Sequence, residues 1–184
     1  AVYGTTGYDF LNIVNNLFVD SRNADDFDAL YAAFTGQTTP FPTLAVEMQM
    51  MMMSDALASE LDSLSTDLAS VVERNRRFRG FTRKSLARAL GAVIAAMPIY
   101  RTYITGPDNI SERDRYYINQ AIRIAKDRNP RLPASLFDFV RDVLLLANLD
   151  EFEEMQQAAL RQFMMEFQQI TGPVMAKSVE DTAF

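Results

Sequence analysis

Hydrophobic side chains recur every three or four positions along most of the chain, the spacing that keeps them on one side of an α-helix. The longest such stretch runs from Pro42 to Gly80, and it begins with a proline and ends with a glycine, as helices often do. We therefore predict one long helix here, along which shorter helices pack. Its apolar positions are Val46, Met50, Met53, Leu57, Leu61, Leu64, Leu68 and Val72.

The same periodicity predicts about six or seven helices around the long one, and hence a mostly α fold. Thr82 and Ser111 stand where a side chain caps the first turn of a helix, and we expect Asp150 to cap the last helix. Gly172 and Pro173 are expected to end that helix. The predicted shorter helices span about 8–18, 24–35, 82–97, 111–128, 134–146 and 150–171.

Some short segments look extended instead of helical. The stretch from Ile99 to Ile104 alternates apolar and polar residues, which predicts a strand that carries Arg101 and Tyr103 on one face. Arginine beside tyrosine is suited to contacting a sugar, and a surface strand that pairs Arg101 with a nearby acid is the alternative interpretation. Residues 1–7 and the last residues of the chain also look extended.

The composition narrows the chemistry. The 184 residues are 48% hydrophobic, enough for one domain with a core, and the net charge of −6 argues against a dedicated nucleic-acid binder. Because the chain has no cysteine and no histidine, it cannot form disulfides, a Ser-His-Asp triad or His-ligated zinc by itself. No apolar run reaches the roughly 18 to 20 residues of a membrane span. We expect a cytoplasmic protein with no cofactor, no metal, no nucleic-acid partner and no membrane association.

Several longer motifs are more specific than this pattern. They are GTTGYDFLN at 4–12, VNNLFVD at 14–20, LASEL at 57–61, MPIYRTYI at 97–104, SLFDFVRDVLLL at 135–146 and FQQITGPVMAKSVEDTAF at 167–184. In this order they resemble maltooligosyltrehalose synthase, or (1→4)-α-D-glucan 1-α-D-glucosylmutase, of the α-amylase clan of glycoside hydrolases. The last motif is similar to the family's FQQLTGPVMAKGVEDTAF almost residue for residue. The resemblance covers essentially the whole chain.

The resemblance implies an internal fragment of a (β/α)8-barrel enzyme. Residues 1–173 would form a helical insertion subdomain, and residues 174–184 would begin a barrel strand and its following loop. The intact enzyme would convert the reducing-end α-1,4 bond of a maltooligosaccharide into an α,α-1,1 bond. In that family the reacting carboxylates lie outside the part that this chain matches, so we assign no catalytic residue here and expect the fragment to be inactive alone.

Residues near the carboxyl ends of barrel strands face the active site, which makes the last motif the first place to look for substrate contacts. The resemblance suggests that Lys177 lies near the reducing-end glucose, where its amine would donate to sugar hydroxyls; alternatively, Lys177 and Asp181 only pair with each other. Glu180 and Asp181 are adjacent and would point to opposite sides of an extended backbone, so they cannot be the facing carboxyl pair of a retaining enzyme. The candidate substrate-binding residues are Lys177, Glu180, Asp181, Tyr8, Asp9, Arg101 and Tyr103.

One residue departs from the family's last motif: Ser178 stands where glycine is usual. If the position requires a positive φ, the serine carries strain of about 1 kcal/mol.

A second hypothesis comes from a different class of function. The chain would be an independent all-helical interaction module without catalysis, binding a partner helix in a groove.

Overall fold

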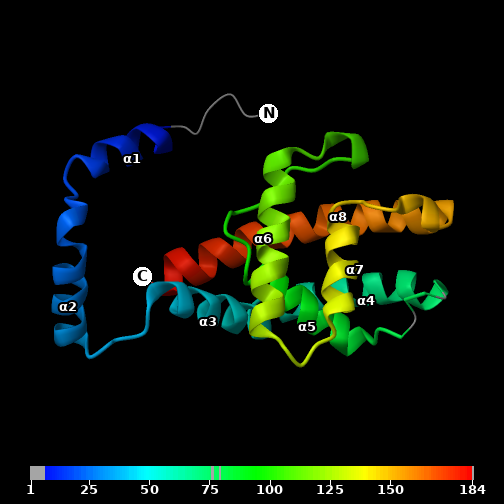
Figure 1. Ribbon diagram of the computed structural model, residues 1–184, viewed down its shortest axis with the longest axis horizontal. Coiled ribbons are helices and arrows are strands. Elements are labelled where there is room, and N and C mark those ends of the chain that lie inside the picture. The colour runs from blue at the N-terminus through cyan, green and yellow to red at the C-terminus, as the bar shows by residue number, and fades with distance from the viewer. Residues whose placement is uncertain (1–6, 76, 79, 184) are drawn as a thin grey trace. The chain divides into compact units, whose positions relative to one another are not determined.

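A computed structural model describes residues 7–75, 77–78 and 80–183. Within these residues the chain forms eight α-helices and no β-strand, which confirms the predicted mostly α fold (Figure 1). The chain divides into two compact units, Ala1–Pro40 and Phe41–Phe184. The expected extended segment at residues 1–7 lies, apart from Gly7, outside the described residues.

The first unit contains α1 (Tyr8–Asn16), the short 3-10 helix η1 (Ser21–Asn23) and α2 (Ala24–Thr35). Gly36 ends α2 in the left-handed conformation, with φ 71°, as predicted. No residue of these three elements is buried, although both α-helices carry many apolar side chains. The exposed ones include Phe10, Ile13, Phe27, Leu30, Tyr31 and Phe34, and in the connection between the helices Leu17, Phe18 and Val19 are exposed as well.

The second unit contains the other helices and the hydrophobic core. The α-helices are α3 (Phe41–Ser54), α4 (Ala58–Arg74), α5 (Arg83–Ile94), α6 (Glu112–Arg128), α7 (Ala134–Leu144) and α8 (Glu154–Met175). Two 3-10 helices, η2 (Pro107–Asn109) and η3 (Leu149–Glu151), lie in the connections, and the π-helix η4 (Ala176–Ala183) follows α8.

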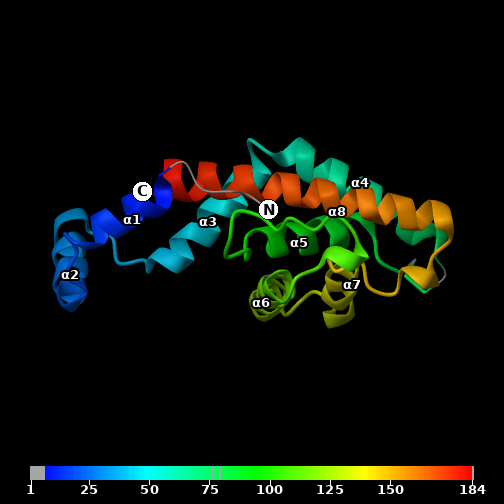
Figure 2. The ribbon, with the colours of Figure 1, turned by 90° about the horizontal axis from the view of Figure 1, so that it is seen from above.

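Helix α5 lies at the centre of this unit. It packs against α4 on one side and against α6 and α7 on the other, and α8 lies along α4 (Figure 2). All residues from Ala89 to Ile94 are buried, together with Leu86. The second half of α5 is apolar on all sides, and such a segment needs neighbours on several sides, which explains this position.

The predicted single helix from Pro42 to Gly80 is wrong, because the structure divides it into α3 and α4. The backbone leaves the helix between Asp55 and Leu57, where the Leu57 N–H reaches the Met52 carbonyl at 2.9 Å, one residue further back than in an α-helix. Helix α3 packs on η4, whereas α4 packs on α5 and α8. Tertiary packing therefore overrides a hydrophobic pattern that is continuous along the chain.

The longest helix is instead α8, with 22 residues. It begins after a capping box formed by Glu153 and Gln156, so the prediction that Asp150 caps it is wrong. Nor do Gly172 and Pro173 end it, since Pro173 lies inside the helix.

The expected strand from Val174 onward is also wrong: residues 174–183 continue as helix. A single strand would leave its backbone N–H and C=O groups without partners, whereas a helix satisfies them locally. This segment packs on α3, where the amide nitrogen of Gln49 lies 3.7 Å from the sulfur of Met175. The assignment of 174–184 to a barrel of a larger protein stays a prediction, and here these residues belong to the second compact unit.

The strain that a positive φ would have caused at Ser178 is not present. Its φ is not positive, and its hydroxyl is buried and donates to the Val174 carbonyl one turn earlier. The substituted residue is therefore accommodated in a right-handed helix.

None of the helices in the described part of the chain has the length and hydrophobicity needed to cross a lipid bilayer.

Candidate functional site

The segment predicted as a strand, Ile99 to Ile104, is a loop that is held by the side chain of Gln168 on α8. The Gln168 amide oxygen accepts from the Ile104 N–H at 2.7 Å and from the Thr102 hydroxyl at 2.9 Å, and its nitrogen donates to the Ile104 carbonyl at 3.0 Å. A buried side chain thus takes the place that a neighbouring strand would have. The strand prediction is wrong because no second strand lies beside this segment in the described residues.

This loop presents the predicted pair of Arg101 and Tyr103. The Arg101 guanidinium lies 4.8 Å from the centre of the Tyr103 ring, a cation–π contact, and the ring is 68% exposed. Arg101 also donates to the side-chain oxygen of Gln169 at 3.2 Å, and no ion pair to an acid is formed by Arg101 among the described residues. The contact between Arg101 and Tyr103 is therefore already formed, and the hydrogen-bond partner of Arg101 is the neutral side-chain amide of Gln169.

The candidates from the last motif lie together on the π-helix η4. Lys177, Glu180 and Asp181 are all exposed, and Lys177 and Asp181 form no ion pair with each other in the part of the chain that the structure describes. The Thr182 hydroxyl donates to the Lys177 carbonyl at 2.6 Å, which ties the end of the helix to this turn. The sequence argument that Glu180 and Asp181 cannot be a facing catalytic pair assumed an extended backbone. The same conclusion applies to the helix that the structure shows, because adjacent residues on a helix do not face each other.

Tyr8 and Asp9 open α1 in the first compact unit, where both are exposed. Asp9 stands in the first turn of the helix, where a negative charge is favourable. Of the seven candidates, the structure therefore joins Arg101 to Tyr103 and places Lys177, Glu180 and Asp181 on one helix, η4.

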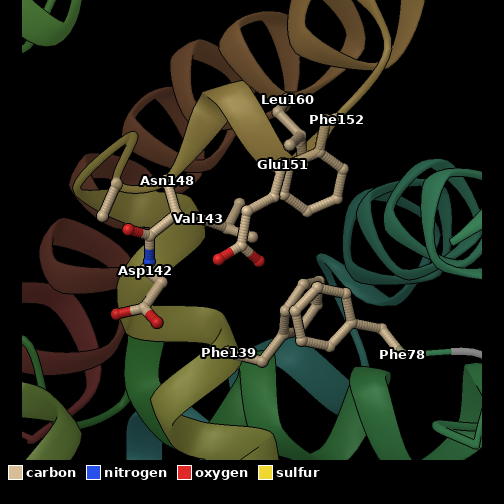
Figure 3. A pocket seen from close by; sticks show the side chains of 9 residues that line it. Phe78, Phe139, Asp142, Val143, Asn148, Glu151, Phe152 and Leu160 are labelled. Atoms are coloured by element: carbon tan, nitrogen blue, oxygen red, sulfur yellow. The ribbon is translucent and has the colours of Figure 1, made fainter. Parts of the chain in front are cut away.

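A small hollow that the sequence did not indicate lies between α7, η3 and the start of α8. Its wall contains the rings of Phe78, Phe139 and Phe152, the carboxylate of Glu151 points toward it, and Asp142 lies at its edge (Figure 3). The Phe78 ring centre lies 4.5 Å from that of Phe139 and 5.9 Å from that of Phe152.

Both carboxylates of this hollow already have partners, since Glu151 pairs with Arg77 and Asp142 with Arg141. The volume of about 10 Å³ is enough for about one water molecule. The hollow is a packing feature and not a ligand site. Among the described residues, no group of three or more acidic side chains is placed to hold a metal ion.

Sequence reasoning missed the role of Gln168 in holding the loop that carries Arg101 and Tyr103. Gln168 lies 64 residues from Ile104 in the chain, and glutamine in a helix gives no signal that its side chain is buried. The only available indication was its position on the inward face of α8, between Phe167 and Thr171, which are both buried.

No family model matches the chain, and no curated protein matches it. The fold is similar to the solved structure of maltooligosyltrehalose synthase from Arthrobacter ramosus, with a TM-score of 0.70 and 26% sequence identity. The match covers 98% of this chain and 20% of that chain, so the present chain spans about one fifth of the length of its structural neighbour.

Proposed function

We propose that this chain is an internal part of an intramolecular glucosyltransferase of the maltooligosyltrehalose synthase type. The observation that carries the proposal is the structural match, in which nearly the whole chain corresponds to one fifth of such an enzyme. The motifs at 4–12, 97–104 and 167–184 support it, because they come from both compact units and occur in the family's order.

The exposed apolar surfaces of α1 and α2 support the proposal that this chain is part of a larger protein. Phe34 on α2 is 90% exposed and Phe10 on α1 is 71% exposed, and neither helix buries a residue. Removing a large apolar side chain from water contributes about 1.5 to 3 kcal/mol, so leaving this many in water is costly. In the proposal, the catalytic barrel of the parent enzyme covers these faces.

The proposed reaction exchanges one glycosidic bond for another. The C1–O4 bond of the reducing-end linkage breaks, and the same C1 forms a bond to the anomeric oxygen of the released glucose, so no water is consumed. This outcome requires that the released glucose stays in the site long enough to turn and that water is kept out. In the proposal the helices form part of the cover over the substrate, and the exposed amine of Lys177 donates to hydroxyls of the reducing-end glucose.

The proposal is tested in the complete reading frame that contains this chain. The parent enzyme and its Lys177→Ala variant are incubated with maltopentaose, and trehalose-ended products are measured against the products of hydrolysis. We expect the variant to shift the ratio toward hydrolysis, because the released glucose escapes more readily. Lys84→Ala, which removes an exposed lysine from α5, is the matched control and should leave the ratio unchanged.

An unchanged ratio in Lys177→Ala would remove Lys177 from the site. The enzyme assignment itself would be overturned if the complete reading frame encodes no barrel and the protein that it encodes forms no trehalose-ended product. The isolated 184-residue chain is expected to be inactive on maltopentaose.

The exposed faces of α1 and α2 also support the second candidate, an interaction module whose partner helix lies on those faces. The reading frame separates the two proposals. A frame that continues on both sides into barrel strands with catalytic carboxylates supports the enzyme, and a frame confined to these helices supports the module.

A further inference from the structure

Helix α6 lies on the outer side of the second unit, where it packs against α5 and α7 (Figure 2). Its buried residues recur at the spacing of three or four positions that places them on one face of a helix, and they are Ile118, Ala121, Ile122 and Ala125. The opposite face is exposed and carries Arg115, Tyr116, Asn119 and Arg123, which we call the arginine face. This face is open to a partner.

The arginine face has the composition of a protein-binding surface. Arginine and tyrosine are enriched in protein–protein interfaces and among the residues that contribute most to binding, whereas lysine and glutamate are depleted there. Tyr116 is 62% exposed, and its ring makes an edge-to-face contact with Tyr117, whose ring centre is 5.3 Å away. The guanidinium of Arg113 lies 5.6 Å from the centre of the Tyr117 ring. Because these contacts already hold the exposed ring, ordering it on binding costs less entropy.

The charges on α6 favour an acidic partner. The helix contains five basic and three acidic residues, although the chain as a whole has a net charge of −6. The two acids of the neighbouring α7 are already paired with Lys126 and Arg141. Neither Arg115 nor Arg123 belongs to an ion pair among the described residues. Their guanidinium groups are therefore available to carboxylates of another molecule, which they can bind through two parallel hydrogen bonds each.

The arginine face differs from the apolar faces of α1 and α2. Permanent interfaces are more hydrophobic than those of proteins that bind and separate, so the exposed rings of Phe10 and Phe34 suit a permanent neighbour and the polar face of α6 suits a separable one. Nucleic acid fits less well, because the net charge of −6 repels a long polyanion, whereas a short acidic segment contacts only this face.

We propose that the arginine face of α6 binds an acidic α-helix of a separate protein. Arg115 and Arg123 are eight residues apart, or roughly 12 Å along the helix axis, so they match two carboxylates with the same spacing on a helix that lies alongside. Tyr116 packs on an apolar side chain between those carboxylates, and Asn119 exchanges hydrogen bonds with a polar one. The proposal does not depend on the proposed function, because it concerns a face that has no role in it.

The test uses the complete protein encoded by the reading frame that contains this chain. The probe is a fluorescein-labelled, alanine-rich helical peptide with glutamate at every fourth position, and binding is followed by fluorescence anisotropy at low and high salt. We expect this peptide to bind and the same peptide with glutamine in place of glutamate not to bind. The double variant Arg115→Ala/Arg123→Ala should weaken binding about tenfold and reduce its dependence on salt, because two charge pairs are lost.

Two further variants separate a defined face from general attraction between charges. Tyr116→Ala should weaken binding while leaving its salt dependence unchanged, since no charge is removed. Lys84→Ala/Arg88→Ala removes two exposed cations from α5 and is the matched control, which should bind as the parent protein does. All of these changes replace exposed side chains, and an unchanged midpoint of thermal unfolding shows that each variant folds.

Three results would overturn the proposal. The first is no binding of the glutamate peptide by the complete protein, and the second is an equal loss of binding in the α5 control and the α6 variant. The third is tighter binding of a single-stranded oligothymidylate through Arg115 and Arg123, which would assign the face to nucleic acid. None of these results affects the proposed function, since that is judged from the products of the complete enzyme.

Discussion

The side chain of Gln168 pairs with the backbone of Ile104 through both of its polar atoms, at 2.7 Å and 3.0 Å. Gln168 is only 2% exposed, and Ile104 is only 1% exposed, so these hydrogen bonds are shielded from water. One helix side chain therefore fixes the loop that presents Arg101 and Tyr103.

Replacement of this glutamine tests how much the loop depends on it. Gln168→Ala leaves the buried N–H and C=O of Ile104 without their partners, and each such group costs about 1 to 3 kcal/mol. We expect the free energy of unfolding to fall by about 2 to 4 kcal/mol, measured by urea denaturation with the m-value checked for change. Gln169→Ala, at the exposed neighbouring position, should change it by no more than about 0.5 kcal/mol. Similar small effects in both variants would show that the loop exchanges the side chain for water.

Gly91 offers a stabilising substitution in the central helix α5. A Cβ atom at this position would lie 3.5 Å from Cδ2 of Leu61, an ordinary van der Waals contact. Because alanine loses less backbone entropy than glycine in a helix, Gly91→Ala should raise the free energy of unfolding by about 0.5 to 1 kcal/mol. Thermal denaturation measures this as a higher midpoint.

The larger variant Gly91→Leu should have the opposite effect, since the buried site between α4 and α5 has no room for three further carbons. A lower midpoint for Gly91→Ala would mean that the two helices are already in tighter contact there than the structure shows.

Asn148 adopts a positive φ of 54° in the connection between α7 and η3. Asparagine tolerates this left-handed conformation, whereas for alanine it costs about 1 kcal/mol of conformational free energy. We expect Asn148→Ala to lower the free energy of unfolding by about that amount and Asn148→Gly to be close to neutral. Chemical denaturation of the two variants side by side provides the measurement, and equal stability would show that the turn changes its conformation.

The pKa of Glu60 is held below the usual glutamate value, chiefly by the hydrogen bond from the Ser59 hydroxyl. Ser59→Ala should therefore raise the pKa of Glu60 toward its ordinary value, which carboxyl NMR titration measures directly, and Ser59→Thr should retain the low value. An unchanged pKa in Ser59→Ala would assign the shift to another cause.

The lowered pKa also sets the direction of a pH effect on stability. A carboxyl whose pKa is lower in the folded state stabilises the fold above its unfolded pKa, and this contribution is lost as the pH falls through the folded pKa. We therefore expect the contribution of the Ser59–Glu60 bond to be absent from Ser59→Ala at every pH and to disappear from the parent chain in acid. The stability of the two proteins should thus change differently between neutral and acidic pH.

Features that depend on a few neighbouring residues could be predicted from the sequence. Helix α2 has the predicted range and ends at Gly36, Thr82 caps α5 by accepting from the Ser85 N–H, and Ser111 forms a capping box with Asp114. The sequence also predicted that Arg101 and Tyr103 lie on one face of a strand, and in the structure the two side chains are in contact although the segment is a loop. In each of these cases the residue that sets the local structure lies within three or four residues of the backbone that it caps or ends.

The sequence by itself thus determined the helical class of the chain and most helix starts, because capping and periodicity act locally. Only the tertiary structure decided the break between α3 and α4, the helical course of residues 174–183 and the clamp of Gln168 on Ile104. These features depend on which segment covers a buried backbone group or an apolar face, and that segment lies tens of residues away in the chain.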